Sequence, residues 1–226
     1  MAESPRCQGS RWQGSQRRIG LTGGIASGKS TVGKLLEEHH GYAVLDADLF
    51  AREALAPGSD GARAVLERYG TQVQTAGSSR ESATLDRPAL GTIVFRNPAE
   101  RHWLEQLVHP LVRERFEQEL ALRASQPAVV LMIPLLFEAG LEGLCSEVWL
   151  IDCDEHQQLA RLMARNGLSQ AEAQERIHAQ WPLERKRRLA DRTINNRGNP
   201  EELAGVVAGA IAAAVRAAAP QKGPSP

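Results

Sequence analysis

The chain alternates between short apolar runs and longer stretches in which apolar and polar residues are mixed. A short apolar run is typical of a buried strand, whereas a mixed stretch with helical spacing predicts a helix. Five runs fit strands, the last with the weakest pattern: Ile19–Thr22, Tyr42–Leu45, Ala128–Ile133, Glu147–Ile151 and Thr193–Asn195. Strands that alternate with helices predict an α/β protein built on a five-stranded parallel sheet.

Several helix boundaries can be predicted from local signals. Ser169 and Glu172 form the S-x-x-E pattern of a capping box, so a helix is expected to begin there. Pro200 suits the first turn of the last helix, where its missing N–H costs little. Pro110 interrupts the helical stretch Arg101–Ala124, and it is predicted to divide that stretch into two helices.

The segment between the second and third predicted strands is too long for a simple crossover. It covers about residues 48–124 and is mainly helical in pattern, so we predict a helical subdomain inserted beside the sheet. Residues 1–17 are rich in Gln, Ser, Gly and Arg and contain no apolar signal segment. We expect residues 1–17 and 220–226 to be flexible tails.

The overall composition argues against several classes of protein. The 27 basic and 27 acidic residues give a net charge of zero, whereas nucleic-acid-binding proteins usually carry a basic excess. The cysteines Cys7, Cys145 and Cys153 form no C-x-x-C pair, which fits the reducing cytoplasm. The longest apolar candidate, Leu203–Val215, falls short of the roughly 18 apolar residues of a membrane span. We therefore expect a cytoplasmic protein with neither nucleic-acid nor membrane partners.

One motif predicts a specific chemistry, because G-x-x-x-x-G-K-S stands between the first predicted strand and a predicted helix. Glycines let several backbone N–H groups approach phosphate oxygens, and the helix dipole favours the same anion. Lys29 is expected to reach the β- and γ-phosphates, and the Ser30 hydroxyl to bind Mg²⁺. The predicted nucleotide-binding residues are Gly23, Gly24, Ile25, Ala26, Ser27, Gly28, Lys29, Ser30 and Thr31.

Two aspartates directly follow the second predicted strand. Asp46 and Asp48 fall at the carboxyl end of that strand, where open α/β sheets bind ligands. A carboxylate there can accept the proton of an acceptor hydroxyl while the loop holds the donor phosphate. The alternative is that Asp48 caps the following helix, or that one aspartate caps while the other works at the site.

Two groups of basic residues occur late in the chain. Arg161 and Arg165 lie four residues apart on one predicted helix face, which suits a lid that closes on a triphosphate. A solvated basic face is the alternative. The run Arg185–Arg188 resembles a nucleic-acid patch, but it has no interleaved aromatic residues. We expect one of its members to face the nucleotide and three to face water.

Other catalytic classes have no matching motif. The six histidines show no metal-ligand spacing, and G-x-S-x-G is absent, which argues against a serine hydrolase. The guanine-reading motif N-K-x-D is also absent, which argues against a GTPase.

From Ile19 to Ala217 the ordered motifs resemble those of the dephospho-CoA kinase family. The phosphate-binding loop is shared by many kinases, whereas the whole series is specific to this family. The matching residues are Leu21–Ser30, Asp46–Asp48 with Ala51 and Arg52, Leu85–Arg87 with Leu90, Phe95, Leu104 and Glu105 with His109 and Pro110, Pro134–Glu138, Gln158 and Leu159 with Arg161 and Arg165, Gln180, Lys186, Ala190 and Asp191, and Asn196.

The resemblance implies a P-loop kinase with a fold like that of the nucleoside-monophosphate kinases. Such an enzyme uses ATP and Mg²⁺ to phosphorylate the 3′-hydroxyl of dephospho-CoA, giving CoA and ADP. It implies a kinase domain over residues 18–219, with a core at 18–47, 126–155 and 190–219, a helical substrate subdomain at about 48–125 and a lid at about 156–189. We expect a monomer or a weak homo-oligomer.

The resemblance also implies roles for individual residues. Asp48 becomes the expected base, and Lys29, Arg161 and Arg165 complete the expected catalytic set. Asn196 is expected beside the nucleotide. The residues expected near the acceptor are Asp46, Arg52, Leu136, Phe137 and Glu138.

Two positions depart from the expected pattern. Ala26 stands where the family most often has glycine, and Met132 stands where many P-loop enzymes carry an aspartate that binds Mg²⁺. Water and phosphate oxygens are then expected to complete the Mg²⁺ shell. Two alternative functions stay open. One is a small-molecule kinase with another acceptor, against which the segment Pro134–Glu138 argues. The other is a non-catalytic nucleotide-binding regulator, against which Asp48 argues.

Overall fold

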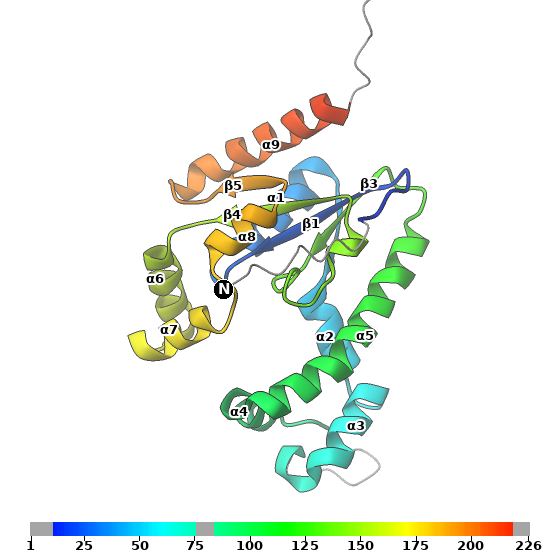
Figure 1. The fold of residues 1–226 in the computed structure, drawn as a ribbon, viewed down its shortest axis with the longest axis vertical. Helices are drawn as coiled ribbons and strands as arrows, with labels where there is room; N and C mark the ends of the chain where they lie inside the picture. The colour runs from blue at the N-terminus through cyan, green and yellow to red at the C-terminus, as the bar shows by residue number, and fades with distance from the viewer. Residues whose placement is uncertain (1–10, 76–83, 219–226) are drawn as a thin grey trace, which may run out of the picture. The chain divides into compact units, whose positions relative to one another are not determined.

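The structure, a computed structural model, describes residues 11–75 and 84–218. Five strands form one sheet in the order β2-β3-β1-β4-β5, and the pairs β1–β3, β1–β4 and β4–β5 are parallel (Figure 1). The strands are β1 (Arg17–Gly23), β2 (Ala43–Asp46), β3 (Ala128–Met132), β4 (Glu147–Asp152) and β5 (Arg192–Asn195). All five apolar runs are therefore confirmed as strands, and the predicted α/β class is confirmed with them.

The chain divides into two compact units. One consists of the described residues up to Leu45 together with those from Ser125 onward, and it holds the sheet; the other, Asp46–Ala124, is helical. The sheet unit contains α1 (Lys29–His40), η2 (Glu142–Leu144), α6 (Glu155–Asn166), α7 (Gln170–His178), α8 (Leu183–Leu189), η3 (Pro200–Glu202) and α9 (Leu203–Ala218). The helical unit contains α2 (Ala47–Ala54), α3 (Asp60–Tyr69), η1 (Gly70–Val73), α4 (Arg87–Arg96) and α5 (Pro98–Leu122).

The strands of the sheet unit are apolar because both faces of the sheet are covered. Ile19 and Leu21 of β1 pack in one core with Val32 and Leu36 of α1 and with Val207 of α9, and all five side chains are fully buried. Burying an aliphatic side chain of this size contributes roughly 1.5–3 kcal/mol. The apolar runs are thus explained by burial on two faces rather than by membrane insertion.

Gly20, between these two core residues, faces the opposite side of the sheet. A β-carbon at Gly20 would lie 2.6 Å from Cys145 Sγ and 2.7 Å from Leu136 Cδ1. Both of those side chains are fully buried, so no side chain fits at this position. The segment from Leu136 to Cys145 therefore lies directly against the strand that leads into the phosphate-binding motif.

The helical unit corrects one prediction. Helix α5 runs without interruption through Pro110, which was predicted to divide it. Proline removes one helix hydrogen bond, but α5 buries Val108, Val112 and Phe116 on both sides of it. Phe116 also packs edge-on against Phe50 of α2, with ring centroids 4.9 Å apart. Packing of the apolar face outweighs the single lost bond and keeps the helix continuous.

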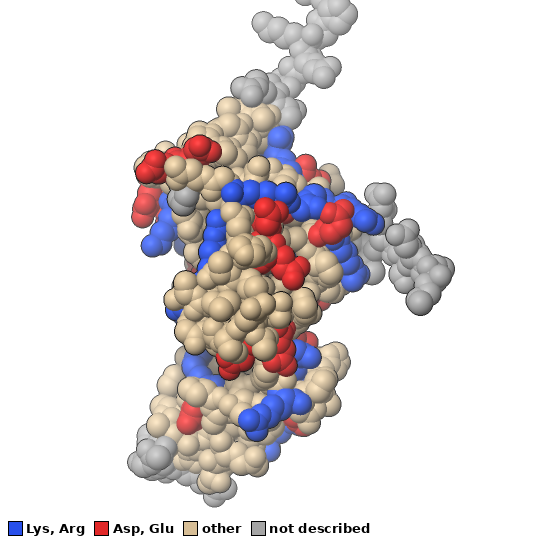
Figure 2. All heavy atoms as spheres, turned by 90° about the vertical axis from the view of Figure 1, so that its left-hand side faces the viewer, with Lys and Arg blue, Asp and Glu red and all other residues tan. Residues whose placement is uncertain are grey.

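Charged side chains of both signs are interspersed on the face drawn in Figure 2. This distribution agrees with the net charge of zero.

Within residues 11–75 and 84–218, no helix combines the length and the apolar character that crossing a membrane would require.

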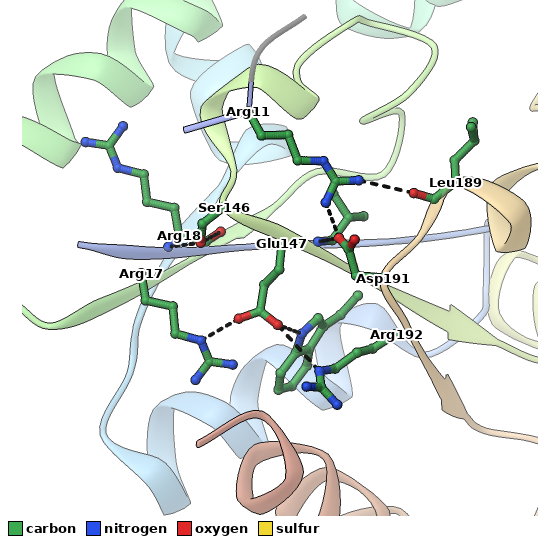
Figure 3. A network of polar contacts seen from close by, with 10 residues as sticks. Arg11, Arg17, Arg18, Ser146, Glu147, Leu189, Asp191 and Arg192 are labelled. Atoms are coloured by element: carbon green, nitrogen blue, oxygen red, sulfur yellow. Dashed lines mark hydrogen bonds and ion pairs between the residues drawn. The ribbon is translucent and has the colours of Figure 1, made fainter. Parts of the chain in front are cut away.

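Part of the predicted N-terminal tail is held against the sheet unit (Figure 3). Arg11 forms an ion pair with Asp191 and donates to the Leu189 carbonyl at 3.3 Å. The Trp12 N–H donates to the Cys145 carbonyl at 3.2 Å, and the Arg18 guanidinium lies 3.4 Å from the Trp12 ring centroid. Residues 11–17 of the predicted tail thus make polar contacts with the sheet unit, and Arg17 is the first residue of β1. Residues 1–10 and 219–226 lie outside the described residues.

Candidate active site

The phosphate-binding motif forms a tight loop between β1 and α1. Gly28, at the helix N-cap, has φ +100°, and a β-carbon there would lie 2.2 Å from Asn196 Nδ2. No side chain caps the N-terminus of α1, so its first N–H groups face the loop. An uncapped helix N-terminus behind a glycine-rich turn is a typical phosphate site.

The lysine of the motif lies across its own loop. Lys29 is 9% exposed, and its Nζ donates to the carbonyls of Gly23 and Gly24, each at 2.9 Å. Ser30 and Thr31 follow on α1 with exposed side chains. The structure thus brings the predicted cation and the two predicted hydroxyls together at one helix end.

Three amide side chains from later in the chain hold the loop from outside. The Gln180 Oε1 accepts from the Ile25 N–H at 2.8 Å, and the Gln158 Nε2 donates to the Ile25 carbonyl at 2.7 Å. The Asn196 Nδ2 donates to the Ser27 carbonyl at 2.7 Å. Asn196 was predicted beside the nucleotide, and it is found on the loop backbone.

Gln158 and Gln180 were matched to the family but were not predicted as site residues. Both are uncharged and lie in helical surroundings, so only their match to an ordered motif series could have drawn attention to them.

The aspartates Asp46 and Asp48 lie in the helical unit as the structure divides the chain. The Asp46 Oδ1 accepts from the Asp48 N–H at 2.9 Å, so Asp46 is the N-cap of α2. Asp48 and Arg52 are exposed. One alternative was that Asp48 caps the helix, and the other was that one of the two aspartates caps it. The structure shows that Asp46, and not Asp48, is the cap.

Residues of the segment Pro134–Glu138 pack and form polar contacts inside the sheet unit. Leu136 is fully buried, and Phe137 is 8% exposed. The Glu138 Oε1 lies 2.7 Å from Lys186 Nζ and accepts from the Trp181 N–H at 3.1 Å. Their predicted contact with the acceptor stays a prediction, whereas their packing role is visible in the structure.

The run Arg185–Arg188 differs from the prediction that three of its members face water. Lys186 is fully buried, and the Arg187 Nη2 donates to Asp152 Oδ1 at 2.8 Å. That hydrogen bond raises the pKa of Arg187. The Arg185 guanidinium lies 3.2 Å from the Trp181 ring centroid, and Arg188 is exposed. Two members are therefore bound inward, because the short helix α8 turns Lys186 and Arg187 toward the sheet.

The two arginines of α6 differ in how firmly they are held. The Arg161 Nη2 donates to the Asn196 carbonyl at 3.2 Å, which ties it to the residue that braces the loop. Arg165 is exposed and its Nε donates to Asn166 Oδ1 at 2.9 Å. Arg161 is thus fixed beside the phosphate-binding loop, while Arg165 lies at the exposed end of the helix.

The donor set for a metal ion is small. Within the described part of the chain, no group of three or more His, Cys, Asp or Glu side chains comes together to hold a metal. Met132 stands where many P-loop enzymes carry an aspartate that binds Mg²⁺. Its sulfur packs against Gly33 of α1, where an added β-carbon would lie only 3.2 Å away. Ser30 stays the predicted oxygen donor of the loop. A single hydroxyl fits Mg²⁺, which keeps most of its waters and is carried by nucleotide phosphates.

A pocket of about 340 Å³ in the helical unit has a different chemistry. Its lining includes Glu53, Asp60 and Glu114 but only one cation, Arg115. Arg115 is already paired with Glu53 at 3.2 Å. Carboxylates repel phosphate esters, so this pocket does not suit a phosphate group.

Comparisons with known proteins agree with this site. Residues 17–202 match the model of the dephospho-CoA kinase family. The chain is 64% identical over 186 residues to a dephospho-CoA kinase of Synechococcus sp. (strain CC9605), covering 82% of this chain and 87% of that protein. It is 57% identical over 190 residues to one of Prochlorococcus marinus (strain MIT 9313), covering 84% of this chain and 93% of that protein.

Two solved structures are similar over nearly their whole length. TT1252 from Thermus thermophilus superposes with a TM-score of 0.75 at 38% identity, covering 89% of this chain and 99% of that one. A dephospho-CoA kinase from Campylobacter jejuni superposes with a TM-score of 0.65 at 26% identity, covering 88% and 98%.

Proposed function

We propose, from the premise that this chain belongs to the dephospho-CoA kinase family, that Gly23–Thr31 hold the donor phosphates and Asp48 serves the acceptor. The reaction is the transfer of the γ-phosphoryl group of ATP to the 3′-hydroxyl of dephospho-CoA, which gives CoA and ADP. The observation that carries the donor half is the braced loop, with buried Lys29 at its centre.

Lys29 supplies the positive charge at the donor. In the structure its ammonium group donates to two loop carbonyls, which hold it within the loop. On nucleotide binding it exchanges toward the β- and γ-phosphates, where charge accumulates during transfer. Positioning and charge stabilisation then supply most of the rate.

Mg²⁺ is the cation that we expect with ATP. Ser30 would hold it, and phosphate oxygens and water would complete its shell. When bound, it neutralises charge on the phosphates.

Asp48 is proposed as the base at the acceptor hydroxyl. Because Asp46 already caps α2, the Asp48 carboxylate is not needed for that role. A carboxylate that accepts a hydroxyl proton raises rates by about 10²–10⁴-fold in typical enzymes.

We further propose that residues 156–189 act as a lid, with Arg161 and Arg165 on its phosphate-facing side. Charge-assisted hydrogen bonds from guanidinium groups suit the transferring phosphoryl group. We also propose a cytoplasmic location, which is supported by the cysteine usage: Cys145 and Cys153 are buried free thiols.

The direct test is a coupled assay in which the purified protein receives MgATP with dephospho-CoA, shikimate or gluconate. We expect ADP and CoA with dephospho-CoA alone. Turnover of another acceptor, with none of dephospho-CoA, would refute the assignment, and binding of ATP without any turnover would favour the regulator.

Lys29→Ala should abolish most turnover while leaving the far-UV spectrum unchanged. The matched control is Lys34→Ala, an exposed lysine of the same helix, which should keep wild-type kcat. Equal activity of the two variants would contradict the role of Lys29.

A further inference from the structure

The peptide groups on both sides of Ile25 are pinned from opposite directions. The Gly24 carbonyl accepts from Lys29 Nζ at 2.9 Å, and the Ile25 N–H of the same peptide donates to Gln180 at 2.8 Å. The next peptide is held through the Ile25 carbonyl, which accepts from Gln158 at 2.7 Å. Because peptide groups are planar, holding one atom of each group orients the other.

The residue that follows has an unfavourable backbone. Ala26 has φ +58°, and among the described residues it is the one non-glycine residue with positive φ. The left-handed region brings the β-carbon of an alanine too close to the following carbonyl, so an unrestrained alanine leaves it. Something in the structure must therefore hold Ala26 in this conformation.

The bond from Gln158 acts directly on that conformation. The Ile25 carbonyl and the Ala26 N–H belong to one trans peptide, so they point in opposite directions. With the carbonyl held by Gln158, the Ala26 N–H points away from Gln158. The Ile25 N–H is already used by Gln180, so Ile25 is a support of the loop rather than a donor to phosphate.

We propose that Gln158 and Gln180 are positioning residues that keep Ala26 in its left-handed conformation and so pre-form the loop for MgATP. This inference rests on the proposed function of the loop as the donor site and adds two residues to it. It treats the amides as supports that do not touch the reacting atoms.

The two amides are themselves firmly held. Gln158 is 3% exposed, and a β-carbon at Gly24 would lie 2.2 Å from its Nε2. Gln180 precedes Trp181, whose N–H donates to Glu138 at 3.1 Å. Both supports belong to the proposed lid, residues 156–189, and a lid that is already seated on the loop lowers the cost of ordering the loop when ATP binds.

The proposal predicts a coupling between positions 180 and 26. Without the support, Ala26 leaves the left-handed region, and the binding-competent fraction falls by roughly 5- to 30-fold. Gln180→Leu should therefore raise the Kd for MgATP by a similar factor. Glycine populates the left-handed region freely, so in the Ala26→Gly background the same change should raise Kd by at most about twofold.

The experiment is a double-mutant cycle on MgATP affinity, measured by calorimetry for wild type, Gln180→Leu, Ala26→Gly and the double variant. Exposed Gln170 on α7 provides the matched control, because Gln170→Leu should leave Kd unchanged in both backgrounds. Gln158→Leu gives a second cycle with the same expected coupling. Thermal melts confirm that each protein is folded.

Additive effects would overturn the proposal, since a merely structural role of Gln180 would cost the same with alanine or glycine at position 26. The kinetic readout compares two parameters of Gln180→Leu with those of wild type. The KM for ATP should rise, while kcat at saturating ATP should change little. Failure of the proposed function is distinguishable, because MgATP affinity is measured without any acceptor. A protein that binds MgATP but does not phosphorylate dephospho-CoA still reports the coupling.

Discussion

The buried ion pair between Glu138 and Lys186 allows a quantitative prediction. Lys186 is fully buried, the Glu138 side chain is 16% exposed, and the two charges lie 2.7 Å apart. Breaking a buried pair by removing one partner typically costs about 3–5 kcal/mol, because the other charge remains without its counter-charge. That loss is a large part of the 5–15 kcal/mol by which proteins of this kind are usually stable.

The two single variants should differ in a defined order. Glu138→Leu leaves the Lys186 ammonium fully buried with the Pro134 carbonyl, 3.3 Å away, as its remaining acceptor. Lys186→Met leaves a carboxylate that still accepts from the Trp181 N–H and is partly exposed. We therefore expect Glu138→Leu to cost about 4–5 kcal/mol and Lys186→Met about 3 kcal/mol.

The double variant Glu138→Leu/Lys186→Met should recover most of the loss. Two apolar side chains of similar length remove both desolvated charges, and such replacements are often nearly neutral. They also remove the Glu138 Oε2, which is buried and has no hydrogen-bond partner among the described residues. We expect the double variant to lie within about 1–2 kcal/mol of wild type.

The assay is urea unfolding at pH 7, followed by far-UV circular dichroism, with the four proteins compared in one double-mutant cycle. Exposed Arg188 on the same helix gives the control Arg188→Met, which should change stability by less than about 0.5 kcal/mol. The reasoning is refuted if both single variants cost less than 1 kcal/mol, or if the double variant loses the sum of the two.

Three further predictions concern other parts of the chain. Asp48→Asn should lower kcat by at least roughly 100-fold with little change in the Kd for ATP, and an unchanged kcat would remove Asp48 from the base role. Burial raises the pKa of Cys145 to about 12 and that of Cys153 to about 11, so both thiols should resist alkylation in the folded protein at pH 8. Since these folded-state pKa values lie above the ordinary value of 9.0, the stability that they contribute is complete below pH 9 and lost as the pH rises toward 12; urea midpoints that stay constant across that range would contradict it. Arg11→Ala should cost no more than about 1 kcal/mol, because the side chains of the Arg11–Asp191 pair are 29% and 42% exposed; a larger loss in urea unfolding would show that the N-terminal segment is more than a surface attachment.

Helix continuity shows where local reasoning ends. Pro110 predicts a break because proline always removes one backbone donor. Whether the helix survives depends on how much apolar surface it buries on each side, and Val108 and Val112 are buried there. That burial depends on partners distant in sequence, so no window around Pro110 could reveal it.

The basic run at residues 185–188 gives the same lesson for charge. Of the four adjacent cations, one was predicted to face the nucleotide and three to face water, since lysine and arginine are rarely buried. The structure buries Lys186 against Glu138, 48 residues earlier in the chain, and binds Arg187 to Asp152. An ion pair between residues distant in sequence cannot be predicted from the local sequence around either residue.

The sequence by itself determined the strands, the phosphate-binding loop and the family, because apolar runs and the G-x-x-x-x-G-K-S spacing are local properties. Only the tertiary structure decided which residues support that loop. Gln158 and Gln180 are neutral amides far from Ile25 along the chain, and they become site residues only because packing brings their hydrogen-bonding atoms to the two peptide groups of Ile25, next to the strained residue Ala26. Local chemistry is encoded in neighbours, whereas support for a strained backbone comes from contacts between segments that folding brings together.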